Sequence, residues 1–223
     1  EGEGHLYFNK GVGTYNCFKC HSTGNVITLA KHLGDKASSI YPGLPQRPTD
    51  PPFSPDLVEQ CHKQLPNHIK EYLLQNRGLS ERKIEDNKIG WGKFYRKNWI
   101  TIPIKDISGN FIYFKLRQDP TKGNAKMTYP KGGTGAQIYG WEMWTNKNPE
   151  HPNNERPLII CEGELDRLLL MSKGEKAVTS THGAGTFKEA WLDSMGKHKE
   201  IFVCFDNDAP GRAGADRVLL MLH

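Results

Sequence analysis

The sequence predicts an α/β protein. A parallel sheet flanked by helices is preceded by a smaller, basic α+β subdomain and a remnant zinc-ribbon-like β module. Three observations predict this arrangement. Two short apolar runs, at 158–161 and 201–205, each lead directly into carboxylates. Strand and helix patterns alternate after residue 158, as they do in parallel sheets. A Cys-x-x-Cys pair, Cys17 and Cys20, lies near the start of the chain.

Length and composition allow one or two soluble domains. Of the 223 residues, 36% are hydrophobic and 25% are charged. No apolar run approaches the roughly 20 residues of a membrane span, and residues 1–9 lack the features of a signal peptide. Five cysteines, an odd number, indicate no disulfide framework, so we expect a reducing, cytoplasmic compartment. Because the chain does not begin with Met, we expect its true start to lie upstream.

Positive charge is concentrated in the middle of the chain. The formal net charge is +5, but residues 88–131 contain ten Lys or Arg residues against two Asp residues, a local net charge of +8. The remainder is therefore net negative. A basic segment beside an acidic one favours a polyanionic partner over a small neutral substrate.

Residues 1–38 form the first predicted domain. The pattern around a Gly-rich turn at 11–13 predicts a hairpin that ends in the Cys knuckle, followed by a short helix over 26–33. Cys17 and Cys20 supply two of the four ligands that a tetrahedral zinc needs. No second pair is evident downstream, where only loose alternatives occur: His5, His21 and His32. Zinc ligation is the leading hypothesis for the pair, with redox chemistry or chance as alternatives.

Residues 39–55 are predicted to be a linker. Six of the fourteen prolines fall between Pro42 and Pro55. Such a segment is extended and semi-rigid, so it is expected to separate two bodies.

Residues 56–150 are predicted to form the basic subdomain. A helical pattern covers 56–80, and Ser80 is expected to cap a second, short helix. Strands at 99–104 and 111–117 flank a Ser-Gly-Asn turn, which indicates a hairpin. On the second strand one face carries aromatics and two cations, namely Phe111, Tyr113, Lys115 and Arg117. This face is either a surface for phosphates and bases or the solvated side of a half-buried strand.

Residues 151–223 are predicted to form the parallel sheet domain. Strands are expected at 158–161, 177–180 and 201–205. Three helices are expected. The first covers 165–171, the second begins at a capping box formed by Thr186 and Glu189, and the third covers 213–220. Cys161 and Cys204 lie inside apolar runs and are predicted to be buried.

Four carboxylates follow the first and last of these strands: Glu162, Asp166, Asp206 and Asp208. Because like charges raise one another's pKa, crowded carboxylates favour a neutralising cation. Magnesium prefers oxygen ligands, and two such ions can hold the attacking and leaving oxygens of a phosphoryl displacement. For Asp166 the alternative is a charge that pairs with the start of a helix.

These acids also carry a resemblance. Two segments resemble the motifs of TOPRIM domains, which occur in bacterial-type primases, topoisomerases and certain nucleases: Glu162-Gly163-Glu164-Leu165-Asp166 and Asp206-Asn207-Asp208-Ala209-Pro210-Gly211. Upstream segments resemble, in order, DnaG-type DNA primases of bacteria or phages, or the primase half of a phage- or plasmid-type primase–helicase. They are the Cys knuckle, Arg77-Gly78-Leu79-Ser80, Leu116-Arg117 and Lys126-Met127-Thr128-Tyr129-Pro130.

The resemblance implies a DNA primase that makes short RNA primers on single-stranded DNA from ribonucleoside triphosphates. It implies that Glu162, Asp206 and Asp208 hold catalytic Mg²⁺ or Mn²⁺, with Asp166 in support. It also implies that Arg117 and Lys126 contact nucleotide or template beside Lys115. Zn²⁺ at the knuckle and a replicative helicase partner are implied as well, in the cytoplasm of a bacterium or a phage-infected host.

Two parts of the family pattern do not occur in this sequence. One is the Cys/His pair upstream of the knuckle, and the other is a third acidic pair after the last helix. We therefore expect an incomplete zinc site and an incomplete set of metal-binding carboxylates in residues 1–223.

Two other functions are consistent with the sequence. A TOPRIM nuclease or topoisomerase would use the same acids but would leave the Cys knuckle unexplained. A primase-derived DNA-binding module of a replicative helicase would need no clustered acids.

Overall fold

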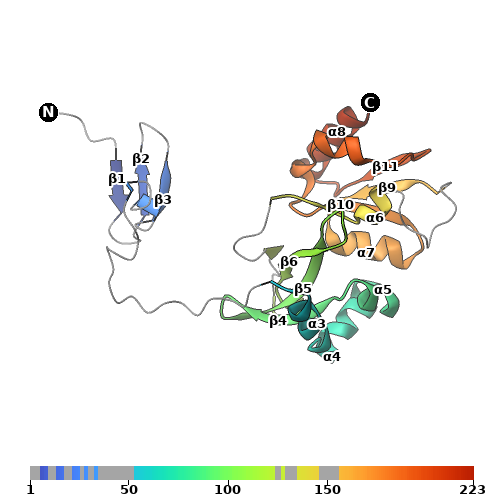
Figure 1. The fold of residues 1–223 in the computed structure, drawn as a ribbon, viewed down its shortest axis with the longest axis horizontal. Helices are drawn as coiled ribbons and strands as arrows, with labels where there is room; N and C mark the ends of the chain where they lie inside the picture. The colour runs from blue at the N-terminus through green and yellow to red at the C-terminus, as the bar shows by residue number, and fades with distance from the viewer. Residues whose placement is uncertain are drawn as a thin grey trace. The chain divides into compact units, whose positions relative to one another are not determined.

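The computed structural model describes the chain at 6–9, 14–17, 22–25, 28–29, 33–34, 53–123, 127–128, 135–145 and 156–223. The chain divides into two compact units, Glu1–Thr49 and Asp50–His223, and each is described by itself (Figure 1). Most of the predicted linker lies outside the described residues, as do Cys20 and Lys126. Within the described parts, no helix is long and apolar enough to cross a membrane.

The first unit contains a three-stranded antiparallel sheet. Its strands are β1 (Leu6–Asn9), β2 (Thr14–Cys17) and β3 (Thr23–Asn25), in the order β1-β2-β3. The predicted hairpin is confirmed, with Leu6 opposite Cys17, while β3 was not predicted. Thr28 and Leu29 are helical, within the range expected for a helix.

The second unit begins with helices, and the helical pattern predicted over 56–80 is present in several separate segments. The segment forms α3 (Pro55–Lys63), α4 (Asn67–Glu71) and a π-helical turn, η1 (Tyr72–Asn76). The break falls at Pro66, which has no N–H to continue a helix and which caps α4 instead. The next helix is α5 (Glu81–Asp86), and its predicted cap is confirmed because Ser80 Oγ accepts from Lys83 N at 3.3 Å.

A four-stranded antiparallel sheet follows, in the order β4-β5-β6-β7. Its strands are β4 (Gly90–Phe94), β5 (Lys97–Lys105), β6 (Phe111–Arg117) and β7 (Met127–Thr128). The β5–β6 hairpin is confirmed, and Asp106 closes its turn by accepting from the Ser108 and Asn110 amides at 2.9 Å. Strand β4 was not predicted. Its Gly90 lies so close to α3 that a Cβ would come within 2.5 Å of the Cys61 carbonyl carbon.

Both faces of this sheet are covered, which decides the surroundings of β6. Phe114 and Leu116 pack with α3 residues, whereas Tyr113 packs in a cluster with residues of α5 and of a later helix, α7 (Glu164–Ser172). Tyr113 is 3% exposed and Lys115 is 8% exposed. Of the two alternatives for this face, the solvated side of a half-buried strand is therefore wrong at Lys115, because helix residues pack where solvent was expected.

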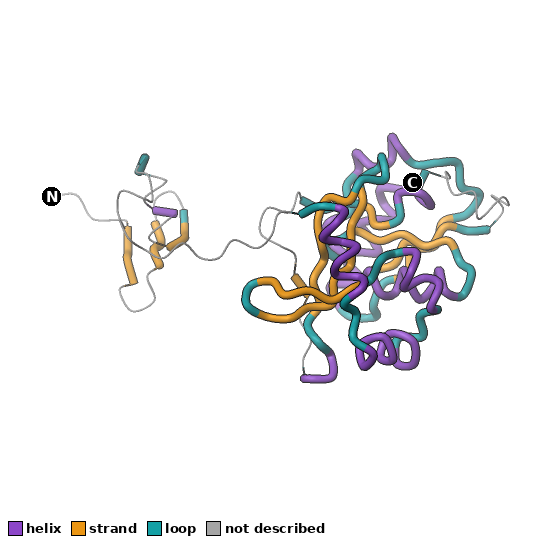
Figure 2. The backbone as a smooth tube through the Cα atoms, turned by 60° about the horizontal axis from the view of Figure 1, so that its bottom comes forward, coloured by secondary structure: helices purple, strands orange, loops and turns teal. Residues whose placement is uncertain are grey.

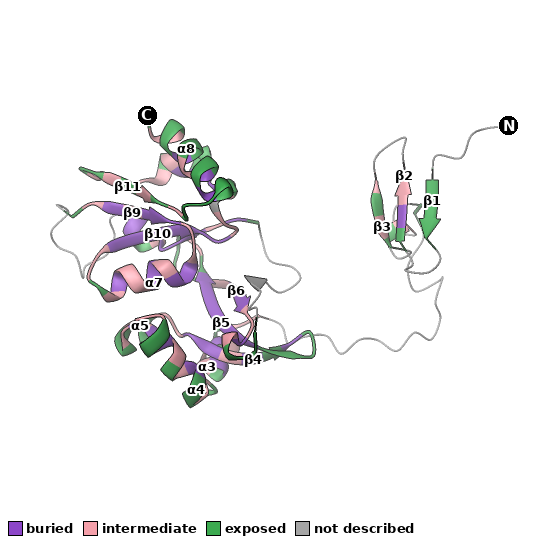
Figure 3. Ribbon diagram, turned by 180° about the vertical axis from the view of Figure 1, so that it is seen from behind, coloured by how far each residue is buried: buried purple, intermediate pink, exposed green. Residues whose placement is uncertain are grey.

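The C-terminal domain is built on a sheet with the order β11-β9-β10-β8. Strands β9 (Leu158–Cys161), β10 (Lys176–Ser180) and β11 (Ile201–Cys204) are parallel, as predicted. The short β8 (Ile138–Tyr139) joins antiparallel to β10 and was not predicted. Helices α7 (Glu164–Ser172) and α8 (Ala209–Leu222) lie on opposite faces of the sheet (Figures 1 and 3). The smaller α6 (Trp141–Trp144) follows β8.

The helix predicted after Thr186 is not an α-helix. Two 3₁₀ segments, η3 (Ala184–Thr186) and η4 (Glu189–Ser194), replace it. Figure 2 distinguishes the helices, strands and loops of the described residues by colour. The capping box does not form because the Thr186 hydroxyl donates back to the Gly183 carbonyl at 2.8 Å. Phe187 and Lys188 are extended, so the two segments cannot join into one helix.

The prediction for the two strand cysteines holds for only one of them. Cys161 on the central β9 is buried, but Cys204 on β11 is exposed. Strand β11 is at the edge of the sheet, and its Phe202 is also exposed (Figure 3). An apolar run predicts a strand but does not tell a central strand from an edge strand.

These positions predict different thiol reactivities. Burial raises the pKa of Cys61 to about 11 and that of Cys161 to about 12, so neither thiol ionises at neutral pH. We expect iodoacetamide at pH 8 to label Cys204 at least about tenfold faster than either, because only the thiolate reacts. Peptide mass spectrometry over time would measure the rates. Equal rates for Cys204 and Cys161 would contradict the exposed position of β11.

Candidate functional site

Parallel pairing brings two predicted acids together at one end of the sheet. Cys161 of β9 lies opposite Cys204 of β11, so the residues that follow each strand emerge side by side. Glu162 Oε2 accepts a hydrogen bond from the Asp206 amide at 3.0 Å. The Thr179 hydroxyl donates to the Glu162 carbonyl at 2.8 Å and fixes the backbone there. We call Glu162, Asp206 and Asp208 the acidic edge.

Asp208 also stabilises the start of α8. It is the N-cap of α8, and its Oδ1 accepts from the Gly211 amide at 2.8 Å. Gly211 lies against the strand exit, where a Cβ would come within 2.1 Å of the Asp206 carbonyl oxygen. The Asp-x-Asp-x-x-Gly spacing therefore fixes both how the helix begins and where the acids lie. The other carboxylate oxygen of Asp208 makes no hydrogen bond within the described part of the chain.

Asp166 lies in the first turn of α7, as predicted, and has a cationic partner. Arg77 Nη2 contacts Asp166 Oδ1 at 3.0 Å. Arg77 is part of the Arg-Gly-Leu-Ser segment that precedes α5, 89 residues away in sequence. The residue types gave no reason to pair them, because the contact depends on how α7 packs against the basic subdomain.

The exposure of the acids bears on which metal ion they could hold. Within the described ranges, no three His, Cys, Asp or Glu side chains converge into a ready-made metal cluster. Asp206 and Asp208 are exposed, and Glu162 and Asp166 are partly exposed. Exposed carboxylates with free oxygens suit Mg²⁺, which keeps several waters and takes few protein ligands. The donor set therefore fits a hydrated divalent ion.

The three predicted cations have different positions. Lys115 is buried, and its ammonium nitrogen lies 3.2 Å from Glu164 Oε1. Arg117 is partly exposed at the end of β6, and its Nε is buried with no hydrogen-bond partner among the described residues. Lys126 lies outside the described residues. Of the two described cations, Arg117 is the one with access to a ligand.

Burial also shifts two titratable groups near the acidic edge. Burial raises the pKa of Glu164, and the nearby ammonium group of Lys115 opposes that rise. Burial lowers the pKa of His182, and the charges of Lys115 and Lys188 lower it further. A neutral His182 therefore follows β10 at this end of the sheet.

A pocket of about 440 Å³ lies apart from the acids, and none of the acidic-edge residues lines it. Four of its charged groups are paired within the protein, Arg167 with Glu142 and Lys83 with Asp86. Lys105, which also lines the pocket, lies over the Phe111 ring at 4.8 Å.

The C-terminal part of the chain is a mainly parallel sheet flanked by helices, with acids at one end of its strands. Residues 159–223 match the family model described as Toprim-like. A DNA primase of Legionella pneumophila is 29% identical over 179 residues, which cover 75% of this chain and 28% of that protein. The chain thus spans less than a third of the length of this relative.

Two solved primase structures are similar to this chain in fold. The zinc-binding and RNA polymerase domains of the Aquifex aeolicus primase match with a TM-score of 0.59 and 17% identity, over 100% of this chain and 67% of that one. The primase fragment of the bacteriophage T7 primase-helicase protein matches with a TM-score of 0.54 and 18% identity, over 94% and 77%. The chain is similar in sequence to a DNA primase and similar in fold to the solved primase structures.

Proposed function

We propose that this chain is the catalytic core of a DNA primase, which joins ribonucleotides into short primers on single-stranded DNA. The observation that carries the proposal is the contact between Glu162 and the Asp206 backbone, which sets two strand-end acids side by side. The similarity to DNA primases supports this reading over a nuclease or topoisomerase, since it extends over the basic subdomain as well.

The acids and the cations have different roles in the proposed nucleotidyl transfer. Glu162, Asp206 and Asp208 would hold Mg²⁺ or Mn²⁺, with Asp166 in support. A bound divalent ion supplies electrostatic stabilisation of charge on the reacting phosphate. Arg117, with Lys126, would bind the nucleotide or the template through phosphate contacts. In the proposed reaction a primer 3′-hydroxyl attacks the α-phosphate of a ribonucleoside triphosphate, and pyrophosphate leaves.

A primer-synthesis assay tests the proposal. The full-length protein would be supplied with single-stranded DNA, ribonucleoside triphosphates and Mg²⁺ or Mn²⁺. We expect short RNA products that require the template. Strand cleavage without incorporation would contradict the primase and favour a TOPRIM nuclease. DNA binding with neither activity would favour an accessory module of a replicative helicase, which is otherwise proposed as a partner.

We also propose that Cys17 and Cys20 are zinc ligands. Cys17 is a free, partly exposed thiol at the end of β2, where its amide donates to the Ser22 carbonyl at 2.9 Å. Since Cys-x-x-Cys supplies half of a tetrahedral site, we expect one zinc per full-length protein and its loss in Cys17→Ser. Metal analysis by mass spectrometry would measure it, with Cys61→Ser as the control. Equal zinc in both variants would contradict the assignment.

A further inference from the structure

Lys115 has surroundings that a nucleic-acid contact does not require. Its side chain and that of Glu164 are only 11% and 6% exposed, with 3.2 Å between ammonium and carboxylate. The ammonium group also donates to the Thr181 carbonyl. These contacts join three elements that are distant in sequence: β6, the first turn of α7, and the loop at 181–183 that follows β10.

The 181–183 loop lies at the same end of the sheet as the acidic edge. Thr179 lies opposite Cys161, so the loop leaves β10 beside the point where Glu162 leaves β9. Thr181 is fully buried and shares a hydrogen bond of 2.6 Å with the Tyr113 hydroxyl. Its hydroxyl also accepts from the Gln137 amide at 3.0 Å. Two residues of β6, Tyr113 and Lys115, thus hold the loop by its first residue.

Glu164 anchors the other side of this arrangement. It is the first residue of α7 and lies between Glu162 and Asp166 in sequence. Lys115 therefore contacts both the helix α7, which begins beside the acidic edge, and the 181–183 loop, which borders the acidic edge. A shift of this ammonium group would change the spacing between the two.

Packing stability does not account for such a pair. Replacing a buried ion pair by apolar side chains of similar volume is often neutral or stabilising, because desolvation offsets the attraction between the charges. Two well-packed apolar residues would hold β6 against α7 as firmly. They would not donate a hydrogen bond to the Thr181 carbonyl. The polar pair therefore fixes the position of the 181–183 loop rather than stabilising the packing of β6 against α7.

We infer that Lys115 is a positioning residue, which with Glu164 fixes the 181–183 loop relative to the acidic edge during nucleotidyl transfer. The inference rests on the proposed function for its catalytic consequence, whereas the position of the loop can be measured without it. It assigns Lys115 a role different from the contact with nucleotide or template that its sequence suggests.

The test uses the double variant Lys115→Met/Glu164→Met in the full-length protein. Either single change leaves a buried charge unpaired and can unfold the domain, whereas the double change removes both charges. Lys115→Arg keeps a cation and its donors. Lys105→Met is the matched control, because Lys105 is an exposed lysine at the end of the neighbouring β5.

Amide hydrogen exchange gives the first readout. We expect the double variant to keep its melting temperature within a few degrees, while amides at 181–186 exchange at least about tenfold faster. Exchange in β9 should not change. Lys115→Arg should retain most of the protection, and Lys105→Met should match the wild type. Unchanged exchange at 181–186 in the double variant would overturn the inference whatever the enzymatic activity.

Steady-state kinetics gives the second readout. Because small misplacements of a site can lower the rate about 100-fold, we expect the double variant to lower kcat by about 10- to 100-fold. KM for the nucleotide should stay within about threefold. An unchanged kcat, or a raised KM with a weaker salt dependence of DNA binding, would overturn the inference in favour of direct contact. A wild-type protein that makes no primers would defeat the proposed function, and the exchange result would still decide whether Lys115 holds the loop.

Discussion

Substitution of Asp206 or Asp208 by Asn is expected to lower nucleotide incorporation on the order of 10³-fold or more, because each change removes charge from a site that works by electrostatic stabilisation. Stability should barely change. Asp206 is exposed, so its neutralisation leaves no buried group unpaired. Asp208 caps α8, and Asn caps a helix about as well as Asp does. Incorporation would be measured with labelled nucleotide, and stability by thermal unfolding.

The matched control for both variants is Asp216→Asn. Asp216 is exposed on the same helix, α8, and is not part of the acidic edge. We expect wild-type incorporation from this control. If Asp206→Asn retained incorporation within a few-fold of the control, the acidic edge would not be the catalytic site.

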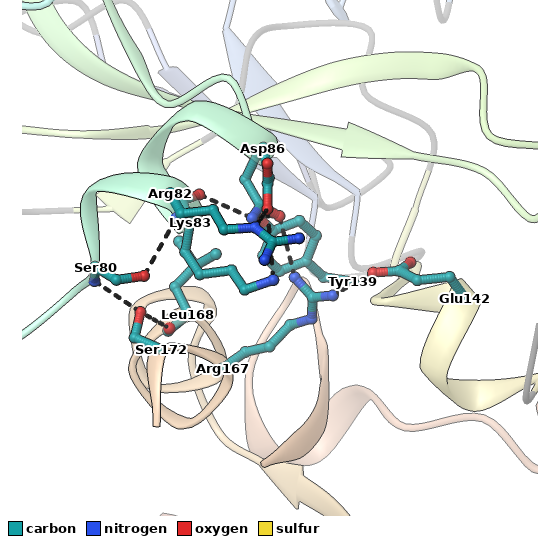
Figure 4. A network of polar contacts seen from close by, with 10 residues as sticks. Ser80, Arg82, Lys83, Asp86, Tyr139, Glu142, Arg167, Leu168 and Ser172 are labelled. Atoms are coloured by element: carbon teal, nitrogen blue, oxygen red, sulfur yellow. Dashed lines mark hydrogen bonds and ion pairs between the residues drawn. The ribbon is translucent and has the colours of Figure 1, made fainter. Parts of the chain in front are cut away.

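Arg167→Met is expected to lower the free energy of unfolding by about 3 kcal/mol, since it removes a buried, multiply bonded cation. Arg167 is 1% exposed. Its guanidinium donates to the Ala177 carbonyl at 3.1 Å and to Asn87 Oδ1 at 3.3 Å, and it pairs with Glu142. It also lies 4.3 Å from the centre of the Tyr139 ring (Figure 4). The variant would leave the Ala177 carbonyl buried without its donor.

Urea unfolding measures this effect, with Arg82→Met as the control. Arg82 pairs with Asp86 at 3.5 Å, but its side chain is 68% exposed. Exposed pairs of this kind contribute about 0–1 kcal/mol. Similar losses in the two variants would show that Arg167 does not join α5, α6 and α7 as its contacts indicate.

The acidic edge could be predicted because its signal is local. An apolar run followed at once by acids marks the end of a buried strand, and two such runs in a parallel sheet share one edge. Glu162 and Asp206 are accordingly in contact. The hairpin of β5 and β6 and the Ser80 cap were likewise predicted from short-range patterns, and both are present.

What could not be predicted depends on tertiary packing. Lys115 follows the alternation of an exposed face, and only the packing of α7 residues against that face buries it. Cys204 lies in an apolar run, but the strand order leaves it at an edge. The pair of Arg77 and Asp166 joins residues 89 positions apart. In each case the deciding neighbour belongs to a distant segment.

Binding of Mn²⁺ to the purified full-length protein tests the central claim most directly, namely that the acidic edge holds a divalent metal ion. Titration followed by electron paramagnetic resonance would count the bound ions for the wild type, for Glu162→Gln/Asp206→Asn and for Asp216→Asn. We predict binding by the wild type and Asp216→Asn, and affinity at least about tenfold weaker in the double variant, because two of the carboxylate ligands are lost. Equal affinity in all three proteins would contradict the account.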